Sequence, residues 1–347
     1  MGEKIKVAVL GATGSVGQRM IALLQEHPWF EISELGASSS SAGKKYGERV
    51  KWFQESLPNE SIADLRIKAC NPDEIESGVI FSALDAGPAT EIEAEFAKRG
   101  RVVISNARSH RMRSDVPLLV PEINADHLEL ISLQQTEGFI VTNPNCSTIG
   151  LVMALKPLED AYGVRRVSVV TMQALSGAGY PGVSSLDIMD NVIPFIGGEE
   201  DKIETEPRKI LGTVSKEGVK FHSMHISAQC NRVPVLDGHL LSVQVELKQK
   251  TTPEDMIRAW KEYEAEPQRL KLPSAPSSPI VYFDQEDYPQ PRLHRNLGNG
   301  MAISIGRLRR DTILDYKFVM LSHNTIRGAA GGTILCAELL KAKGYIK

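Results

Sequence analysis

Cys146 is the residue whose type and surroundings point most directly to chemistry. It lies in TNPNCSTIG (residues 142–150), between an Asn-Pro-Asn turn and an apolar run that predicts a helix. A nucleophilic thiol must ionise, yet a free thiol with a pKa near 8.5 is only about 3% ionised at pH 7. A helix N-terminus stabilises the thiolate by roughly 0.3–1 kcal/mol, which lowers that pKa by less than one. Cys146 is therefore either a buried structural thiol or a nucleophile with a basic partner elsewhere in the chain.

His239 is the candidate partner with the most informative context. It follows an Asp-Gly turn, and the alternate positions that share its strand face are otherwise apolar: Leu241, Val243, Val245 and Leu247. Such a histidine is either a hydrogen-bonded core residue or a desolvated acid/base, and the spacing leaves both open. Arg232, seven residues earlier, is either solvated or able to grip a substrate carboxylate bidentately.

A glycine-rich turn near the N-terminus predicts a dinucleotide site. GATGSVG (residues 11–17) places Gly11, Gly14 and Gly17 directly after a predicted strand and at the start of a predicted helix, with Thr13, Ser15 and Val16 between them. Glycine lets the backbone turn tightly and approach a pyrophosphate, which the N–H groups of the helix N-terminus then bind. The alternative is a Gly-rich turn that binds nothing.

The following predicted strand favours NADP over NAD. An NAD site places a carboxylate about 20 residues after the glycines, where it binds the ribose 2′-hydroxyl. This chain instead has GASSSSAGKK (residues 36–45), with hydroxyls at Ser38, Ser39, Ser40 and Ser41 and cations at Lys44 and Lys45. Hydroxyl donors and cations suit a 2′-phosphate, although a solvated loop would have the same composition.

The chain predicts two domains of different fold. Strands and helices alternate through residues 1–145, which indicates an α/β fold with a Rossmann-like doubly wound parallel sheet. After residue 150 the predicted strands often follow one another without a helix, which indicates an α+β catalytic and dimerisation domain (146–324) with a mainly antiparallel sheet. We expect helices near 183–196 and 253–265, an exposed loop at 271–291, and a C-terminal amphipathic helix (325–347) that packs back on the first domain.

Composition excludes several classes of protein. The chain has 347 residues, a net charge of −3 and no block of like charges, so neither a nucleic-acid nor a membrane partner is expected. Its four cysteines are widely spaced, which argues against a disulfide framework and for a reducing, cytoplasmic compartment. The N-terminal apolar stretch is too short for a secretory signal. His222 and His225 lack a third ligand nearby, so no metal site is expected.

Five segments together resemble the archaeal and fungal subgroup of the aspartate-β-semialdehyde dehydrogenases. They are GATGSVG, PNCSTI (144–149), QALSGAGYPG (173–182), CNRVPVLDGH (230–239) and NTIRGAAGG (324–332), in order over nearly the whole chain. The resemblance implies that Cys146 attacks an aldehyde, that His239 is the general acid/base and that Gln173 orients the thioester. It also implies that Arg232 binds the substrate carboxylate.

The resemblance extends to the other ligands. EPRKIL (206–211) is similar to the family's acidic-then-Lys motif, which implies Glu206 for the substrate amino group and Lys209 for phosphate; Glu199, Glu200 and Glu204 are close competitors of Glu206. Arg111 and Asn145 would complete the phosphate site. Ser176, Gly177 and Asn324 would contact the cofactor. The family also implies a homodimer or homotetramer.

The implied activity is the NADPH-dependent conversion of L-4-aspartyl phosphate into L-aspartate 4-semialdehyde through a cysteine thioester. Its nearest rival is a malonyl-CoA reductase, which would use the same cysteine, histidine and NADPH. Glyceraldehyde-3-phosphate dehydrogenase and N-acetylglutamyl-phosphate reductase fit the motifs less well. A non-catalytic NADP sensor would tolerate the loss of Cys146, His239 or Gln173, and all three are present.

Overall fold

The N-terminal part of the chain forms a six-stranded parallel sheet. The computed structural model describes residues 3–347. The strands of this sheet are β1 (Ile5–Leu10), β2 (Phe30–Ala37), β3 (Ile67–Ala69), β4 (Val79–Ser82), β5 (Val102–Ser105) and β6 (Phe139–Thr142). Their order is β3-β2-β1-β4-β5-β6, and every pair is parallel. The order reverses between β1 and β4, which is where doubly wound sheets bind nucleotides at the carboxyl ends of their strands.

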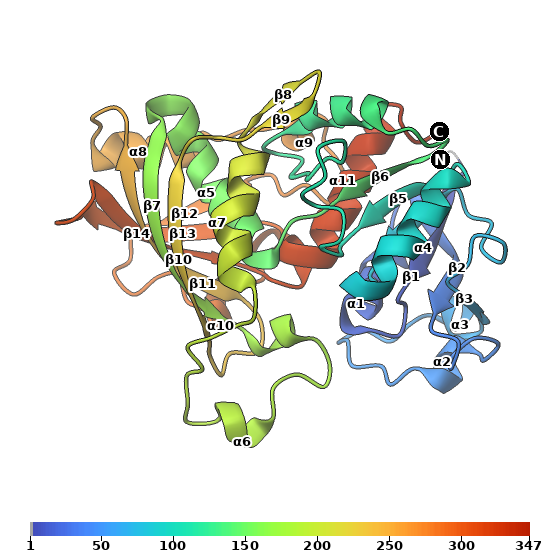
Figure 1. Cartoon of the computed structure of the whole chain (residues 1–347). Coiled ribbons are helices and arrows are strands. Elements are labelled where there is room, and N and C mark those ends of the chain that lie inside the picture. Colours follow the sequence, from blue (N-terminus) through green and yellow to red (C-terminus); the bar gives the residue numbers. More distant parts are fainter. Residues whose placement is uncertain (1–2) are drawn as a thin grey trace.

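Helices cover both faces of this sheet, as parallel strands require. They are α1 (Ser15–Leu24), α2 (Tyr46–Arg49), α3 (Glu60–Ala63), α4 (Ala86–Lys98), the 3-10 helix η1 (Ala125–Leu133) and the C-terminal α11 (Gly331–Ala342). α11 joins the core formed by β1, β2 and α1, and it lies beside the parallel sheet in Figure 1. Residues 331–340 are all buried, so this helix is enclosed all round rather than amphipathic as the sequence pattern suggested.

A second six-stranded sheet forms the other part of the molecule (Figure 1). Its strands are β7 (Val164–Gln173), β10 (His225–Arg232), β11 (His239–Leu247), β12 (Ile280–Phe283), β13 (Ile303–Arg310) and β14 (Tyr316–Ser322), in the order β10-β7-β11-β14-β13-β12. The three central pairs are antiparallel and the two outer pairs are parallel, so the sheet is mixed with a mainly antiparallel centre. A short hairpin, β8 (Thr213–Ser215) and β9 (Gly218–Lys220), stands apart.

Three helices pack their apolar sides on this sheet: α5 (Cys146–Tyr162), α7 (Glu199–Ile210) and α8 (Pro253–Lys261). The remaining elements are single turns: η2 (Leu175–Ala178), α6 (Ser185–Ile188), α9 (Glu266–Arg269), α10 (Pro291–His294), η3 (Leu297–Gly300) and the π-helical turn η4 (Ile326–Ala330). Among residues 3–347, no helix is both long enough and apolar enough to span a membrane. The same residues contain no cluster of three or more His, Cys, Asp or Glu side chains that could hold a metal ion.

Two local predictions are wrong. The helix expected at 183–196 is limited to one turn, α6, because Asp190 takes a positive φ and Ile193 forms a β-bridge with Arg232. The apolar side chains that mimicked a helical period there stay exposed: Leu186, Met189, Val192 and Phe195. The loop expected at 271–291 contains the edge strand β12, whose four residues IVYF were masked by the surrounding Pro and Ser residues.

Candidate active site

The glycine-rich turn requires glycine for steric reasons. Gly11 has a φ of +71°, and a Cβ on it would lie 2.4 Å from the carbonyl oxygen of Ala83. A Cβ on Gly17 would lie 2.2 Å from the carbonyl oxygen of Gly11, so α1 could not pack against the turn. Gly14 precedes the first residue of α1 and leaves the N–H groups of that helix uncapped by any side chain. This geometry suits the approach of a pyrophosphate.

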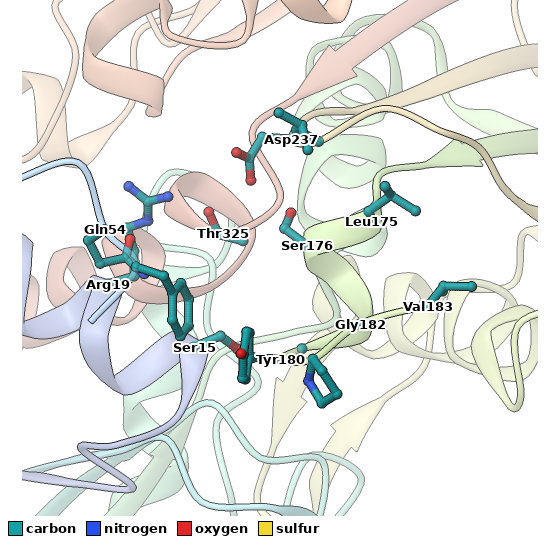
Figure 2. A pocket seen from close by; sticks show the side chains of 14 residues that line it. Ser15, Arg19, Gln54, Leu175, Ser176, Tyr180, Gly182, Val183, Asp237 and Thr325 are labelled. Atoms are coloured by element: carbon teal, nitrogen blue, oxygen red, sulfur yellow. The ribbon is translucent and has the colours of Figure 1, made fainter. Parts of the chain in front are cut away.

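A cavity of about 350 Å³ lies between this turn and the second domain. Figure 2 shows Ser15, Arg19 and Gln54 on one side, and Leu175, Ser176 and Val183 on the other. Ser176 accepts a hydrogen bond from the side chain of Asn324 at 2.7 Å, and Asn324 itself accepts one from the Gly238 N–H at 2.8 Å. The cavity therefore joins the predicted cofactor site to the strand that carries His239.

The serines predicted to contact a 2′-phosphate follow β2 directly. Ser38, Ser39 and Ser40 are exposed, while Ser41 is buried. The Ser38 and Ser40 hydroxyls lie 3.0 Å apart, and Lys44 donates to the Ser40 carbonyl oxygen at 3.1 Å. No carboxylate belongs to this stretch, so its accessible hydroxyls and cation fit a phosphate monoester on the ribose.

Cys146 is the first residue of α5. The side-chain oxygen of Asn145 caps the helix by accepting from the N–H groups of Ser147 at 2.9 Å and Thr148 at 3.2 Å. The backbone of η4 closes the other side, because a Cβ on Gly328 would lie only 2.7 Å from that of Cys146. The thiol is thus held at a helix N-terminus by two segments far apart in the sequence.

His239 faces the thiol from the first residue of β11. Its Nε2 lies 3.2 Å from the Cys146 Sγ, and its Nδ1 accepts a hydrogen bond from the Ala174 N–H at 3.0 Å. An acceptor at Nδ1 places the proton of the neutral ring on Nε2, so the ring donates toward the sulfur. The ring could take the thiol proton only as an imidazolium, with a proton on Nδ1 as well. Nδ1 would then lose the hydrogen bond that it accepts from the Ala174 N–H.

Both groups are neutral in the free protein. Burial raises the pKa of Cys146 to about 12, the Glu199 charge adds to the rise, and Arg111, Lys202 and Arg232 act against it. Burial, with the positive charge of Arg232, lowers the pKa of His239 to about 3. Both shifts disfavour a pre-formed ion pair, and groups that a substrate brings or neutralises would promote ionisation of the thiol.

Glu199 is the acidic residue whose charge bears most on Cys146. Its carboxylate accepts from the side chains of Asn145 at 2.9 Å and Gln173 at 3.3 Å, and pairs with Lys202 at 2.6 Å. Burial raises the pKa of Glu199, but the Lys202 charge and these hydrogen bonds outweigh it, so the pKa is lowered overall. An ionised, largely buried carboxylate beside the thiol is a site for an ammonium group.

Arg232 closes the site opposite the acid. It is 6% exposed and donates to the Ala174 carbonyl oxygen at 2.6 Å. A Cβ on Gly177 would lie 2.9 Å from its guanidinium and 3.1 Å from the His239 ring, so only glycine lets η2 lie this close to both. This packing explains why residue 177 is glycine, and its contact with the cofactor stays a prediction.

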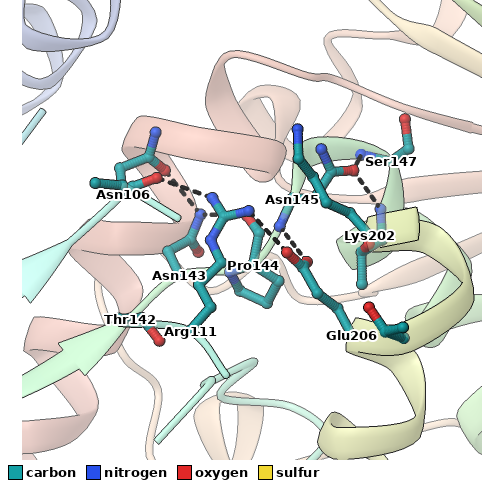
Figure 3. Close-up of polar contacts among 12 residues, drawn as sticks. Asn106, Arg111, Thr142, Asn143, Pro144, Asn145, Ser147, Lys202 and Glu206 are labelled. Atoms are coloured by element: carbon teal, nitrogen blue, oxygen red, sulfur yellow. Dashed lines mark hydrogen bonds and ion pairs between the residues drawn. The ribbon is translucent and has the colours of Figure 1, made fainter. Parts of the chain in front are cut away.

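Arg111 and Glu206 form a buried ion pair. Arg111 Nη1 lies 2.9 Å from Glu206 Oε1, and Nη2 donates to the Asn106 carbonyl oxygen at 2.9 Å (Figure 3). The other oxygen of Glu206 accepts from the Asn145 N–H at 2.7 Å. Both oxygens of Glu206 are thus held by protein donors, and its partner Arg111 is buried. Glu199 also has donors on both oxygens, but its partner Lys202 is partly exposed, so a substrate amino group could replace Lys202 more readily than Arg111.

Lys209 is enclosed as well. It is fully buried, and its Nζ donates to the carbonyl oxygens of Arg111, Arg113 and Val116 at 2.6, 2.6 and 2.8 Å. An ammonium has three hydrogens, so none is left for a phosphate. The expected phosphate role of Lys209 therefore has to be corrected, because the residue holds the loop that carries Arg111.

Lys202 is the residue that the sequence reasoning missed. α7 repeats an E-x-x-K spacing, at 199–202 and again at 206–209. Seven residues are two helical turns, so both pairs lie on one face and their spacing cannot show which is nearer the thiol. Only the packing of α7 against α5 decides this. Both Glu199 and Glu206 reach Asn145, but the charges that act on the Cys146 thiol are those of Glu199 and Lys202, and Lys202 remains partly exposed.

The fold and site together define a class: two-domain dehydrogenases that hold a thiol beside a dinucleotide fold. Family models for the NAD binding domain and the dimerisation domain of semialdehyde dehydrogenase match residues 6–131 and 155–327. The chain belongs to the semialdehyde dehydrogenase family, among its aspartate-semialdehyde dehydrogenases.

Full-length relatives support this assignment. The chain is 51% identical to the aspartate-semialdehyde dehydrogenase of Schizosaccharomyces pombe, over 98% of this chain and 99% of that one. It is 49% identical to the enzyme of Archaeoglobus fulgidus, over 97% and 98%. The crystal structure of the Candida albicans enzyme with NADP superposes with a TM-score of 0.92 at 46% identity, over 99% of this chain and 100% of that one. A Vibrio cholerae enzyme complexed with ASA gives 0.79 at 27% identity, with the same coverage.

Proposed function

We propose that this protein reduces L-4-aspartyl phosphate with NADPH to L-aspartate 4-semialdehyde, NADP⁺ and phosphate, in the biosynthesis of lysine, threonine, methionine and isoleucine. The observation that carries the proposal is the Cys146–His239 pair at 3.2 Å, set among buried charges of both signs beside a dinucleotide turn. The near-full-length identity to aspartate-semialdehyde dehydrogenases supports this activity rather than malonyl-CoA reduction.

The charges around the thiol match those of the substrate. We assign the substrate carboxylate to Arg232 and its ammonium to Glu199, in place of the Glu206 assigned from the sequence. The phosphate falls to Arg111 and Lys202, in place of Lys209. Two anionic groups and one cationic group then each meet an opposite charge, which a buried site requires.

Substrate binding itself would favour the thiolate. The Glu199 charge raises the pKa of Cys146 in the free protein, and a bound ammonium would neutralise that charge. The positive charges of Arg111, Lys202 and Arg232, which lower the pKa of Cys146, would then no longer be opposed by the charge of Glu199. His239 would stabilise the thiolate by donating from Nε2.

The chemistry follows from these positions. The Cys146 thiolate adds to the acyl carbon, the C–O bond to phosphate breaks, and the leaving phosphate, held by Arg111, takes up the proton that the thiol gave up on ionising. Gln173 orients the carbonyl of the resulting thioester. NADPH, when bound, supplies the hydride that reduces this carbonyl carbon. The hemithioacetal oxygen accepts a hydrogen bond from His239, and its collapse releases the aldehyde and regenerates the thiolate.

The turn at 11–17 fits the cofactor, since Gly11 and Gly17 let the backbone pack tightly on itself and on Ala83, and no side chain caps the N–H groups at the start of α1 that would bind a pyrophosphate. We propose that NADP is held by the following residues: Gly11, Thr13, Gly14, Ser15, Val16, Gly17, Ser38, Ser39, Ser40, Ser176, Gly177 and Asn324. The domain division at 1–145 and 146–324, with 325–347 returning to the first domain, is part of the same proposal. We also propose that the protein forms a homodimer or homotetramer, in line with the dimerisation-domain match. The thiol would work in a reducing, cytoplasmic compartment.

The test is the initial rate with NADP⁺ and L-aspartate 4-semialdehyde, with and without phosphate. NADPH formation that depends on phosphate is the expected result. A parallel assay follows NADPH oxidation by malonyl-CoA. Reduction of malonyl-CoA without phosphate-dependent turnover would refute the assigned substrate while leaving the thiol chemistry in place.

A further inference from the structure

We propose that Glu206 is a positioning residue that couples the phosphate site to the nucleophile. The inference rests on the proposed function, because it takes Arg111 as a phosphate ligand. Glu206 would not contact the substrate. Its role would be to hold Arg111 and the turn before Cys146 at a fixed separation, so that a phosphate oxygen meets the thioester carbon in line.

The carboxylate bridges two elements with one oxygen each. Oε1 pairs with Arg111, which follows β5, and Oε2 accepts from the N–H of Asn145, which directly precedes Cys146 (Figure 3). The Glu206 side chain is 3% exposed. A bidentate bridge of this kind, closed off from water, restricts both partners more than a surface ion pair would.

The rest of the surroundings makes the bridge rigid. Arg111 also donates to the Asn106 carbonyl oxygen, and the Asn106 side chain accepts from Asn143 at 3.0 Å. One turn further along α7, Lys209 binds three carbonyl oxygens of the loop that carries Arg111. Glu206 and Lys209 therefore clamp the Arg111 loop to α7 through its side chain and its backbone.

This arrangement separates two half-reactions. Addition of the thiolate to the aldehyde and oxidation to the thioester need Cys146, His239 and Arg232. Attack by phosphate on the thioester additionally needs Arg111 at a fixed place. Loss of the Glu206 bridge should therefore slow the attack of phosphate on the thioester and leave the formation of the thioester unchanged.

The variant Glu206→Gln isolates the bridge, because its amide oxygen can still accept from the Asn145 N–H while its NH₂ group faces Arg111. We expect the KM for phosphate to rise at least tenfold. The pre-steady-state burst of NADPH, measured with semialdehyde and NADP⁺ but without phosphate, should stay within about twofold. Asp201→Asn, which removes an exposed carboxylate from the same helix, is the matched control and should change neither quantity.

A double-mutant cycle tests the coupling directly. Arg111→Lys alone should also raise the phosphate KM, and the double variant should be less impaired than the product of the two single effects. Glu206→Asp, which keeps the charge but shortens the reach, should fall between wild type and Glu206→Gln, and it serves if Glu206→Gln does not fold.

Two results would overturn the proposal. A lower phosphate KM in Glu206→Gln would mean that Glu206 merely neutralises Arg111. A lower melting temperature with an unchanged phosphate KM would mean that its role is structural. Absence of phosphate-dependent turnover in the wild-type protein would instead refute the proposed function, so the two failures are distinguishable.

Discussion

At the scale of single residues, the neutral state of Cys146 has a measurable consequence. Its pKa of about 12 lies above the working pH, so the thiolate fraction grows with each rise in pH. Alkylation of the free enzyme by iodoacetamide should therefore accelerate about tenfold per pH unit between pH 7 and 9. The Cys146→Ser variant corrects for labelling of Cys70. A rate that is already at a plateau at pH 7 would show a pre-formed thiolate–imidazolium pair.

The two lysines of α7 should respond differently to removal of their charge. Lys202→Met should raise the phosphate KM about tenfold with little change in stability, because Lys202 is partly exposed at the thiol end of the helix. Lys209→Met should instead leave three buried carbonyl oxygens without a donor and destabilise the fold by roughly 2–5 kcal/mol. Phosphate saturation curves and urea unfolding of both variants separate these outcomes. The reverse pattern would restore Lys209 as the phosphate ligand.

Residue types identified the chemistry, but they did not identify every position. Cys146 and His239 stand out in the sequence because each has an unusual local context, a helix start and an apolar strand face. The acid and lysine could not be fixed in the same way, since two E-x-x-K pairs share one face of α7. Which pair meets the thiol depends on the approach of α5 to α7, a tertiary contact that leaves no local signal.

At the scale of elements, two segments meet across the cofactor cavity. Phe53 stacks on Tyr180 with ring centroids 5.1 Å apart, and the Lys51 ammonium donates to the Tyr180 hydroxyl at 2.5 Å. Phe53 and Tyr180 both line the cavity, so this contact joins its two walls.

Tyr180→Ala should therefore raise the KM for NADP⁺ about fivefold and leave the KM for semialdehyde nearly unchanged. Tyr180 lines the cavity, and an aromatic contact of its ring with the cofactor would contribute roughly 0.5–1.5 kcal/mol, which is a factor of about two to ten in affinity. Leu57→Ala, at an exposed position of the first domain, is the control. Equal effects on both substrates would argue against a specific cofactor contact.

Elements with strong local signals were predicted from the sequence, and elements defined by long-range contacts were not. β7 and β11 were predicted from alternating apolar and polar residues. This alternation arises because one face of each strand is buried and the other is less buried. The apolar spacing at 186–195 looked helical, but Ile193 is bound to Arg232 on another segment. The edge strand β12 depends on pairing with β13 rather than on its own length.

At the scale of the whole molecule, α11 links the two domains. It follows β14 and η4 of the second sheet, yet its side chains complete the core of the first. Leu339→Ala should consequently lower the unfolding free energy of the first domain by about 2–5 kcal/mol, the cost of a buried cavity. Urea unfolding with and without NADP⁺ would detect this, since the cofactor stabilises the domain that binds it. Loss of stability confined to the second domain would contradict the role of α11.

The place of α11 also bears on how the chain is made. A ribosome releases residues 331–342 only after the entire second sheet has been synthesised, although the parallel sheet near the N-terminus needs that helix for its core. The first domain must therefore wait, with apolar surface uncovered, until the second sheet has been synthesised. Chaperone dependence of nascent chains should accordingly persist until residues 331–342 have left the ribosome, and a ribosome stalled before residue 331 should hold an N-terminal domain unable to retain NADP.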